Sequence, residues 1–231
     1  MKKGDMRKQE IMNTAETLFC KNGFEQTSIQ DILDLLKISK GSFYHHFLSK
    51  ETLLEEICRK RAKQIFESVS LSISAGNSHT DNLNTLFSGM IPLTGEKLGF
   101  LMMLLPVLRL PEGTSLKACF CESLSELFRA SVIHEIDEGC KTGTMFCLRP
   151  SAAADICLHL INKLWLTICE LILTAVQERT EANTSELLTL SDEYRFTIEK
   201  ILTLPYGSME LISIPALRVL CEQIGNHWKE N

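Results

Sequence analysis

The stretch from Thr27 to Lys50 constrains the fold most, because it joins a capped amphipathic helix, a short break and a second helix. Thr27 is predicted to cap the first helix, and Gln30, three residues later, completes the spacing of a capping box. Apolar residues then recur at helical spacing and form one face: Ile29, Ile32, Leu33 and Leu36. Residues 37–39 form the break, and Ser39 is placed to cap the next helix.

The second helix, predicted over Lys40–Phe47, has two faces of opposite character. Phe43 and Phe47 lie four residues apart, so both rings point to the same inward side. At about 100° per residue, the outer side carries small, polar and aromatic residues: Gly41, Ser42 and His45, with Tyr44 and His46 on the flanks and Lys40 at the start. Ser49 is placed to cap a third helix, whose first turn holds Lys50.

This layout indicates a helix-turn-helix whose second helix is the recognition helix. The small residues Gly41 and Ser42 permit close approach to a groove, and the phenol and imidazoles donate to phosphates or base edges. Lys50 lies at a helix start, where free amides and a cation together favour a phosphate oxygen. The plain alternative is a helical hairpin with a polar outer face. The clustering of donors opposite two inward Phe rings favours the nucleic-acid interpretation.

Further residues around this stretch complete a specific pattern. The pattern consists of Ile11, Ala15, Leu18-Phe19, Asn22-Gly23-Phe24, Thr27-Ser28, Asp31-Ile32, Ser39-Lys40-Gly41-Ser42-Phe43-Tyr44, His46-Phe47, Lys50-Glu51 and Leu53-Leu54. Over roughly residues 5–65, it resembles the DNA-binding domain of TetR/AcrR-type transcriptional regulators. One departure is visible, because Leu36-Lys37-Ile38 stands where the family usually has Ala-Gly-Val. We expect Lys37 to take the left-handed conformation that Gly adopts more easily.

The resemblance also implies roles for single residues. Tyr44, His46 and Lys50 match family positions that contact the phosphate backbone or nearby bases. Thr27 and Ser28 match a helix start that meets a phosphate. The choice of sequence is expected from the residues that face the groove: Lys40, Gly41, Ser42 and His45.

Charge is distributed unevenly along the chain. Residues 1–63 hold 12 Lys and Arg against 9 Asp and Glu, a net +3, in a chain whose net charge is −5. A basic small domain on an acidic larger one fits DNA at one end. No apolar region follows the basic start Met1–Lys3, and the longest apolar run, Leu98–Leu108, is too short to span a bilayer. The prediction is a soluble, cytoplasmic protein without a membrane partner.

The nine Cys residues are expected to be mostly small buried hydrophobes. The spacing of Cys119, Cys121, Cys140 and Cys147 fits no zinc template, so neither a metal nor a cofactor is predicted. Regulation by thiol oxidation stays open, although no neighbouring residue indicates a lowered thiol pKa. The sequence has no recognisable nucleophile–base pair, paired carboxylates or phosphate loop, so an enzyme is not predicted.

The predicted fold is all-α. A three-helix helix-turn-helix domain (1–48) is joined by a long linking helix (49–72) to a larger helical ligand-binding and dimerisation domain (73–231). The predicted helices are Met6–Asn22, the two described above, 49–72, Asp81–Ile91, Gly95–Leu110, Ser115–Cys140, Pro150–Arg179, Ser185–Leu204 and Ser213–Gly225.

Two features of the larger domain follow from the resemblance. It implies a ligand pocket, for which the candidates are Met and aromatic residues: Phe66, Phe87, Met90, Phe100, Met103, Phe120, Phe128 and Trp165. It also implies a homodimer, in which the helices near 150–179 and 185–204 pair with their twins. The alternative for both sets is ordinary burial within one chain.

The predicted function is a transcriptional regulator, and more specifically a repressor released from a pseudo-palindromic DNA operator by a small, largely apolar effector. The alternative keeps DNA binding and replaces the effector by a protein partner or by thiol oxidation.

Overall fold

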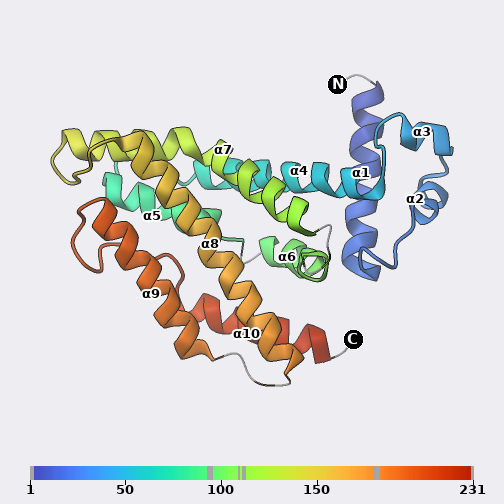
Figure 1. Cartoon of the computed structure of the whole chain (residues 1–231). Helices are drawn as coiled ribbons and strands as arrows, with labels where there is room; N and C mark the ends of the chain where they lie inside the picture. The colour runs from blue at the N-terminus through green and yellow to red at the C-terminus, as the bar shows by residue number, and fades with distance from the viewer. Residues whose placement is uncertain are drawn as a thin grey trace. The chain divides into compact units, whose positions relative to one another are not determined.

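The computed structural model describes residues 3–92, 96–108, 110, 113–178, 180 and 183–229, and these residues form ten helices and no strand (Figure 1). This confirms the predicted all-α class. The helices are α1 (Lys3–Asn22), α2 (Ile29–Leu36), α3 (Lys40–Tyr44), α4 (Lys50–Ser70), α5 (His79–Met90), α6 (Glu96–Val107), α7 (Gly113–Lys141), α8 (Pro150–Gln177), α9 (Thr184–Ile201) and α10 (Ile214–Lys229).

Each predicted helix has a counterpart, but several ends are shifted. The helix predicted over Lys40–Phe47 is shorter as α3, although the amide of Phe47 still donates to the carbonyl of Phe43 at 3.0 Å. The helix predicted to reach Leu204 ends at Ile201, because Thr203 adopts a positive φ of 54°. Two predicted helix ends, Gly95 and Arg179, lie outside the described residues.

The chain divides into two compact units. The first comprises Met1–Lys63 with Gly99–Ser123, and the second comprises Gln64–Leu98 with Leu124–Asn231. Both α4 and α7 contribute to each unit. The division predicted from the sequence, 1–48, 49–72 and 73–231, concerns function and stays a prediction.

Five apolar side chains from α1, α2, α3 and the loops after α1 and α3 form part of the core of the first unit. Each of them is at most 4% exposed: Phe19, Phe24, Ile32, Phe43 and Phe47. Phe19 and Phe24 meet edge to face at 5.1 Å between ring centroids, on either side of Gly23, whose φ is +88°. Burying each such side chain contributes roughly 1.5–3 kcal/mol, which holds the short helices together.

The start of α2 differs from the prediction. Its cap is Ser28, whose Oγ accepts from the amide of Asp31 at 3.2 Å, while the Asp31 carboxylate accepts from the Ser28 amide at 2.7 Å. These hydrogen bonds hold the pKa of Asp31 below its usual value. The predicted Thr27–Gln30 capping box is therefore wrong. Thr27 is fully buried, and its hydroxyl donates to the carbonyl of Gly23 at 2.8 Å.

The break between α2 and α3 agrees with the prediction. Lys37 lies in the left-handed region, with φ 53° and ψ 46°, and the amide of Ile38 donates to the carbonyl of Leu33 at 3.1 Å. Ser39 then caps α3 by accepting from the amide of Ser42 at 3.3 Å. Together these bonds satisfy backbone groups at both helix ends and fix the turn.

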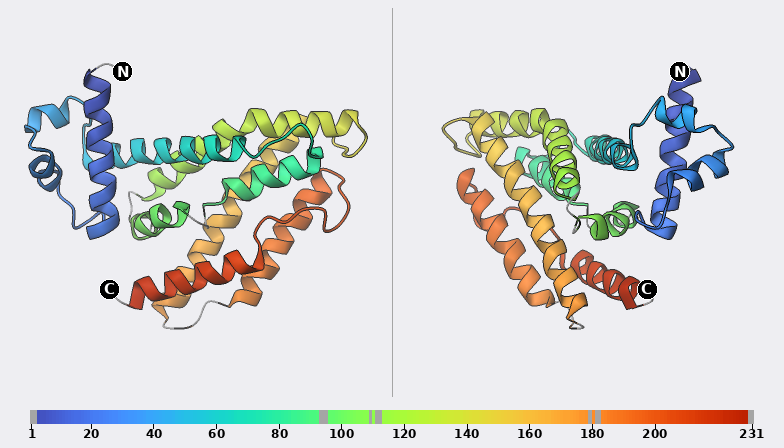
Figure 2. Two further views of the ribbon diagram at one scale, coloured as in Figure 1. Left: turned by 180° about the vertical axis from the view of Figure 1, so that it is seen from behind. Right: turned by 45° about the vertical axis from the view of Figure 1, so that its right-hand side comes forward.

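In the second unit, α8 packs against α5, α9 and α10 (Figure 2). Residues Pro150–Ala175 are long and apolar enough to cross a membrane by length and composition. However, 56% of the apolar 18-residue stretch within this segment is buried inside the protein, which is typical of a core helix. The expectation of no membrane-spanning segment rested on the shorter run Leu98–Leu108 and did not take this helix into account.

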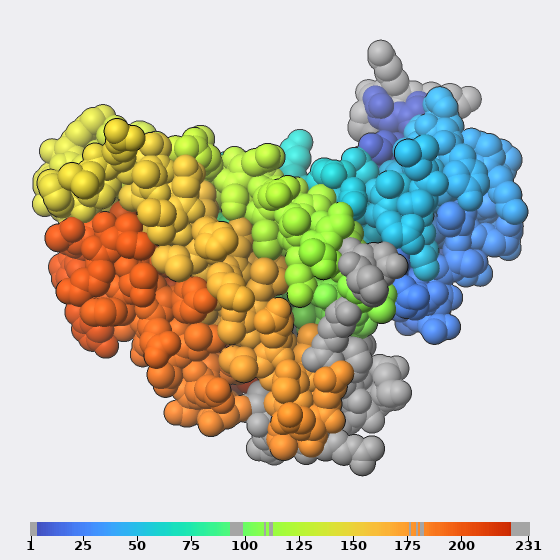
Figure 3. All heavy atoms as spheres, viewed as in Figure 1, coloured from blue at the N-terminus to red at the C-terminus, as the bar shows by residue number. Residues whose placement is uncertain are grey.

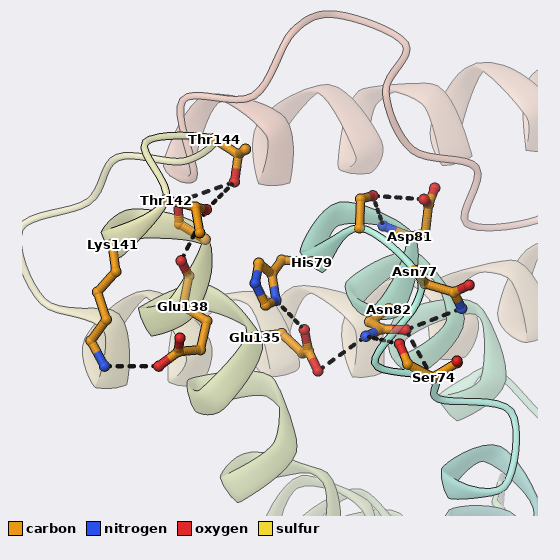
Figure 4. A network of polar contacts seen from close by, with 12 residues as sticks. Ser74, Asn77, His79, Asp81, Asn82, Glu135, Glu138, Lys141, Thr142 and Thr144 are labelled. Atoms are coloured by element: carbon orange, nitrogen blue, oxygen red, sulfur yellow. Dashed lines mark hydrogen bonds and ion pairs between the residues drawn. The ribbon is translucent and has the colours of Figure 1, made fainter.

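A buried polar network fixes the start of α5 to α7 (Figure 4). Glu135, 5% exposed, lies 2.7 Å from the His79 ring nitrogen Nδ1 and accepts from the Asn82 side-chain amide at 3.3 Å. Asn82 also donates to the carbonyl of Ser74 at 3.1 Å. The turn that follows α4 is thereby tied to α5, and α5 to α7. A buried carboxylate paired in this way positions these elements more than it stabilises them.

The turn at Lys37 generates a stability prediction. Lys37→Gly is expected to raise the free energy of unfolding by about 0.5–1 kcal/mol, because Gly adopts a positive φ without the clash of a β-carbon. Lys37→Ala removes the same charge and keeps the β-carbon, so it should bring no such gain. Urea unfolding of both variants measures the difference, and equal stabilities would contradict this explanation.

Candidate nucleic-acid interface

The outer face of α3 is open to solvent, as the sequence predicts. Lys40, Gly41, Tyr44 and His45 are exposed, with Tyr44 at 50%, whereas Phe43 on the other side is fully buried. A β-carbon placed on Gly41 would meet nothing closer than the Ser39 hydroxyl at 3.8 Å. The protein therefore leaves open space above Gly41, which a nucleic acid backbone could approach.

Two imidazoles follow α3, and their surroundings differ. His45 is exposed and His46 is partly buried, and their ring centroids lie 4.9 Å apart. Burial, together with the positive charge of His45, Lys8 and Arg7, lowers the pKa of His46 below its usual 6.5. At neutral pH His46 is therefore a neutral hydrogen-bonding group and not a cation. Its role toward DNA would be a directional contact.

The charges near His46 come from α1, which the sequence analysis did not include in the interface. Arg7 pairs with Glu10 at 2.7 Å, and Lys8 pairs with Glu56 at 2.7 Å. The Lys8 ammonium also lies 5.6 Å from the centroid of the Phe47 ring. No local motif marks these residues, because only folding brings the Arg7 and Lys8 charges of α1 near His46.

The Lys50 ammonium makes two hydrogen bonds within the first unit. Its Nζ donates to the carbonyls of Phe24 at 2.8 Å and Thr27 at 3.1 Å, and lies 4.2 Å from the Phe24 ring centroid. An ammonium carries three protons, so one remains for a phosphate oxygen. Lys50 thus fastens the loop before α2 to the start of α4, whatever it contributes to DNA.

Thr27 and Ser28 are placed differently from the expectation. Because the Thr27 side chain is buried, it leaves the set of candidate DNA contacts. Ser28 is exposed, but its hydroxyl donates to the Asp31 carboxylate at 2.8 Å. A carboxylate at this helix start repels a phosphate, which weakens the case for a phosphate contact there.

The eight candidate pocket residues fall into both units. Phe100, Met103 and Phe120 lie in the first unit and are at most 6% exposed. The second unit holds the other five: Phe66, partly buried and edge to face with Phe128 at 5.1 Å, and the fully buried Phe87, Met90, Phe128 and Trp165. The Trp165 indole donates to Asn162 at 3.2 Å, which places a polar group among these apolar side chains.

The helices predicted to mediate dimerisation lie side by side, and Figure 3 shows their outer surfaces next to each other. They carry large apolar side chains toward solvent: Ile156 is 51% exposed on α8, and Phe196 is 43% exposed on α9. Tyr206, just after α9, is 75% exposed. Exposed apolar groups on neighbouring helices are typical of surfaces that another protein covers.

The nine Cys are free thiols, and Cys58, Cys157 and Cys169 are buried. In the part of the chain that the structure describes, no three His, Cys, Asp or Glu residues are grouped so as to hold a metal ion. Burial raises the pKa of Cys121 and of Cys157 to about 12 in each case. These two thiols therefore stay protonated at neutral pH.

Comparison with known proteins connects the first unit to a family. A family model described as bacterial regulatory proteins of the tetR family matches residues 11–57. The HTH-type transcriptional repressor KstR2 of Mycolicibacterium smegmatis is 35% identical over 81 residues, which are 35% of this chain and 40% of that protein. The uncharacterised HTH-type regulator YerO of Bacillus subtilis is 31% identical over 143 residues, 58% of this chain and 48% of that protein. The match thus spans less than half of either curated relative.

Solved structures extend the similarity of fold to the whole chain. A putative TetR-family regulator from Mesorhizobium loti has a TM-score of 0.56 at 19% identity, covering 100% of this chain and 98% of that one. The fatty acid degradation regulator FadR of Bacillus halodurans has a TM-score of 0.55 at 15% identity, covering 86% and 97%. A regulator from Saccharomonospora viridis in complex with choline has a TM-score of 0.55 at 18% identity, covering 86% and 98%.

The internal contacts of Lys50 generate a second prediction. Lys50→Met keeps the aliphatic stem but leaves two carbonyls without their charged donor, so we expect a loss of about 2 kcal/mol in the free energy of unfolding. Lys40→Met, at an exposed position, should change it by less than about 0.5 kcal/mol. Urea unfolding compares the two. If Lys50→Met were as stable as Lys40→Met, the two hydrogen bonds of Lys50 to backbone carbonyls would contribute nothing to the free energy of unfolding.

Proposed function

This chain belongs to the TetR family of bacterial regulatory proteins, and we propose that it is a transcriptional repressor that binds a pseudo-palindromic DNA operator. The observation that carries this proposal is the exposed outer face of α3, held in place by the buried ring of Phe43. Small and polar residues on that face meet base edges, and Tyr44 and His46 position the helix by contacts to phosphates or nearby bases. The chain acts by binding and not as an enzyme, and its place of action is the cytoplasm.

A homodimer gives this DNA binding its geometry. Two copies related by a twofold axis place two recognition helices in successive major grooves, which is why such operators are pseudo-palindromic. We assign the dimer contact to α8 and α9, whose exposed apolar groups Ile156 and Phe196 support this assignment. Pairing these helices with their twins removes that surface from water.

The proposed control is a small, largely apolar effector that binds the larger helical domain. The buried apolar and aromatic side chains of the second unit, Phe87, Met90, Phe128 and Trp165, support this choice. The effector must bind the DNA-free form better than the DNA-bound form, because only differential affinity shifts an equilibrium. A coupling of about 2 kcal/mol changes DNA affinity about thirty-fold. The alternative is control by a protein partner or by thiol oxidation.

The test of DNA binding uses two glycines with matched surroundings. Gly41 is exposed on α3, and Gly99 is exposed on α6, where an added β-carbon would meet nothing within 4 Å. Each Gly→Ala change should leave the fold at least as stable, because Ala is the better helix residue by about 0.5–1 kcal/mol. We expect Gly41→Ala to lower operator affinity about tenfold or more, because its methyl group occupies the space above α3. Gly99→Ala should bind like the unchanged protein.

The measurement is fluorescence anisotropy with the DNA upstream of the protein's own gene, over a salt series. Specific binding should weaken steeply with salt, and Lys40→Met should reduce the slope by about one. If the unchanged protein bound this DNA no better than random DNA, and a genomic selection also returned no site, the repressor proposal would fail.

The effector generates a separate prediction. In a reducing buffer, an apolar or amphipathic compound should release the protein from its operator, about thirty-fold at saturation for the coupling given above. Because one protein of similar fold is named for fatty acid degradation and another was solved in complex with choline, long-chain acyl compounds and choline are the first to test. If no compound released the DNA while a thiol oxidant did, the alternative form of control would replace the effector.

A further inference from the structure

Two thiols of the second unit lie in contact. Cys140, in the last turn of α7, and Cys147, shortly before α8, place their Sγ atoms 3.7 Å apart. A disulfide requires about 2.05 Å between the sulfurs. The remaining approach is under two ångströms, which is within the range of side-chain rotation with a small backbone adjustment. The fold thus brings together two Cys that are seven residues apart in the sequence.

The turn between the two thiols is well defined by hydrogen bonds. The hydroxyls of Thr142 and Thr144 donate to the carbonyls of Glu138 and Gly139, at 3.0 and 3.1 Å, and close the end of α7 (Figure 4). Gly143 between them takes a φ of +75°, which reverses the chain. Because this reversal directs the following segment back along α7, Cys147 returns to the side of Cys140.

The pair is within reach of a dissolved oxidant. Both thiols are partly exposed, and Cys147 lines a surface groove with its neighbours Phe146 and Leu148. These neighbours are 65% and 92% exposed, so the segment lies open to solvent. By contrast, Cys157 is fully buried, so its thiol is shielded from a dissolved oxidant although it has the same chemistry.

We propose that Cys140 and Cys147 are a modification site, at which a peroxide converts the dithiol into a reversible intramolecular disulfide. One thiolate attacks hydrogen peroxide, so that an S–O bond forms, the O–O bond breaks and water leaves. The second thiol attacks the sulfenic sulfur, so that the S–S bond forms, the S–O bond breaks and a second water leaves. The dithiol loses two electrons and two protons, and one peroxide is reduced to two waters. A small thiol reductant reverses the change by exchange.

The surroundings of Cys147 slow the reaction of its thiol with an oxidant. Partial burial, followed by the hydrogen bond and charge of Cys140, raises the pKa of Cys147 to about 11. Because the thiolate is the reactive form, Cys147 reacts sparingly at neutral pH.

Closing the disulfide acts on the end of α9. The Phe146 amide donates to the carbonyl of Leu202 at 3.0 Å, and the Thr203 hydroxyl donates to the carbonyl of Phe146 at 3.0 Å. Drawing Cys147 toward α7 pulls on both bonds. Oxidation should therefore weaken the protection of the Phe146 amide against hydrogen exchange.

The test uses the full chain at pH 8.5 with hydrogen peroxide, followed by alkylation, digestion and mass spectrometry. We expect a cross-linked pair of peptides carrying Cys140 and Cys147, lighter by two hydrogens and restored by a thiol reductant. Cys140→Ser and Cys147→Ser should each abolish it, whereas Cys221→Ser, at a partly exposed thiol on α10, should not. Circular dichroism checks that all three variants stay folded.

Two results would overturn the proposal: oxidation of these thiols to sulfinic acids without a cross-link, or an equal yield of other disulfides in the unchanged protein. Exchange of the Phe146 amide gives a second readout, which should rise several-fold on oxidation and stay constant in Cys140→Ser. Because both readouts are independent of DNA, the proposal stands or falls separately from operator binding.

Discussion

The burial of Phe43 and Phe47 is the constraint on which the proposed DNA-binding face depends. Both rings are at most 2% exposed, and Phe43 comes from a helix of only five residues. A helix this short has little stability of its own, so packing must supply it. Because the rings fix which side of α3 faces inward, they also fix that Lys40, Gly41 and His45 face outward. The same packing that stabilises the domain therefore orients its recognition surface.

Lys50, which the sequence predicts as a DNA contact, makes hydrogen bonds that hold the fold. Its bonds to the carbonyls of Phe24 and Thr27 close the loop between α1 and α2 at the start of α4. A charged residue in such a position looks like a phosphate ligand from the sequence alone. In the structure its ammonium donates two protons to backbone carbonyls, and only the third remains for a phosphate oxygen. Loss of DNA binding on changing Lys50 would therefore say little about direct contact.

The second unit is organised by burial along α8, with specific polar contacts placed at its edges. Glu135 connects α5 to α7, and the turn around Gly143 brings Cys147 back to Cys140. Neither arrangement has a local sequence signal, because the residues involved come from different helices or meet across a chain reversal. From the sequence, Cys140 and Cys147 fit no zinc-binding spacing, and thiol oxidation stayed open without any sign of which cysteines would pair.

The sequence by itself determined the helical class and the inward side of α3, because both depend on hydrophobic periodicity, and the family resemblance indicated the left-handed turn at Lys37. The predicted cap of α2 lay one residue early, because Thr27 and Ser28 are both favourable capping residues and only packing decides which is buried. Tertiary structure alone decided that Lys50 holds the loop before α2, that α1 brings its charges near His46, and that Cys140 and Cys147 come into contact across a chain reversal. Each of these depends on groups separated along the chain, whose contact no short-range pattern specifies.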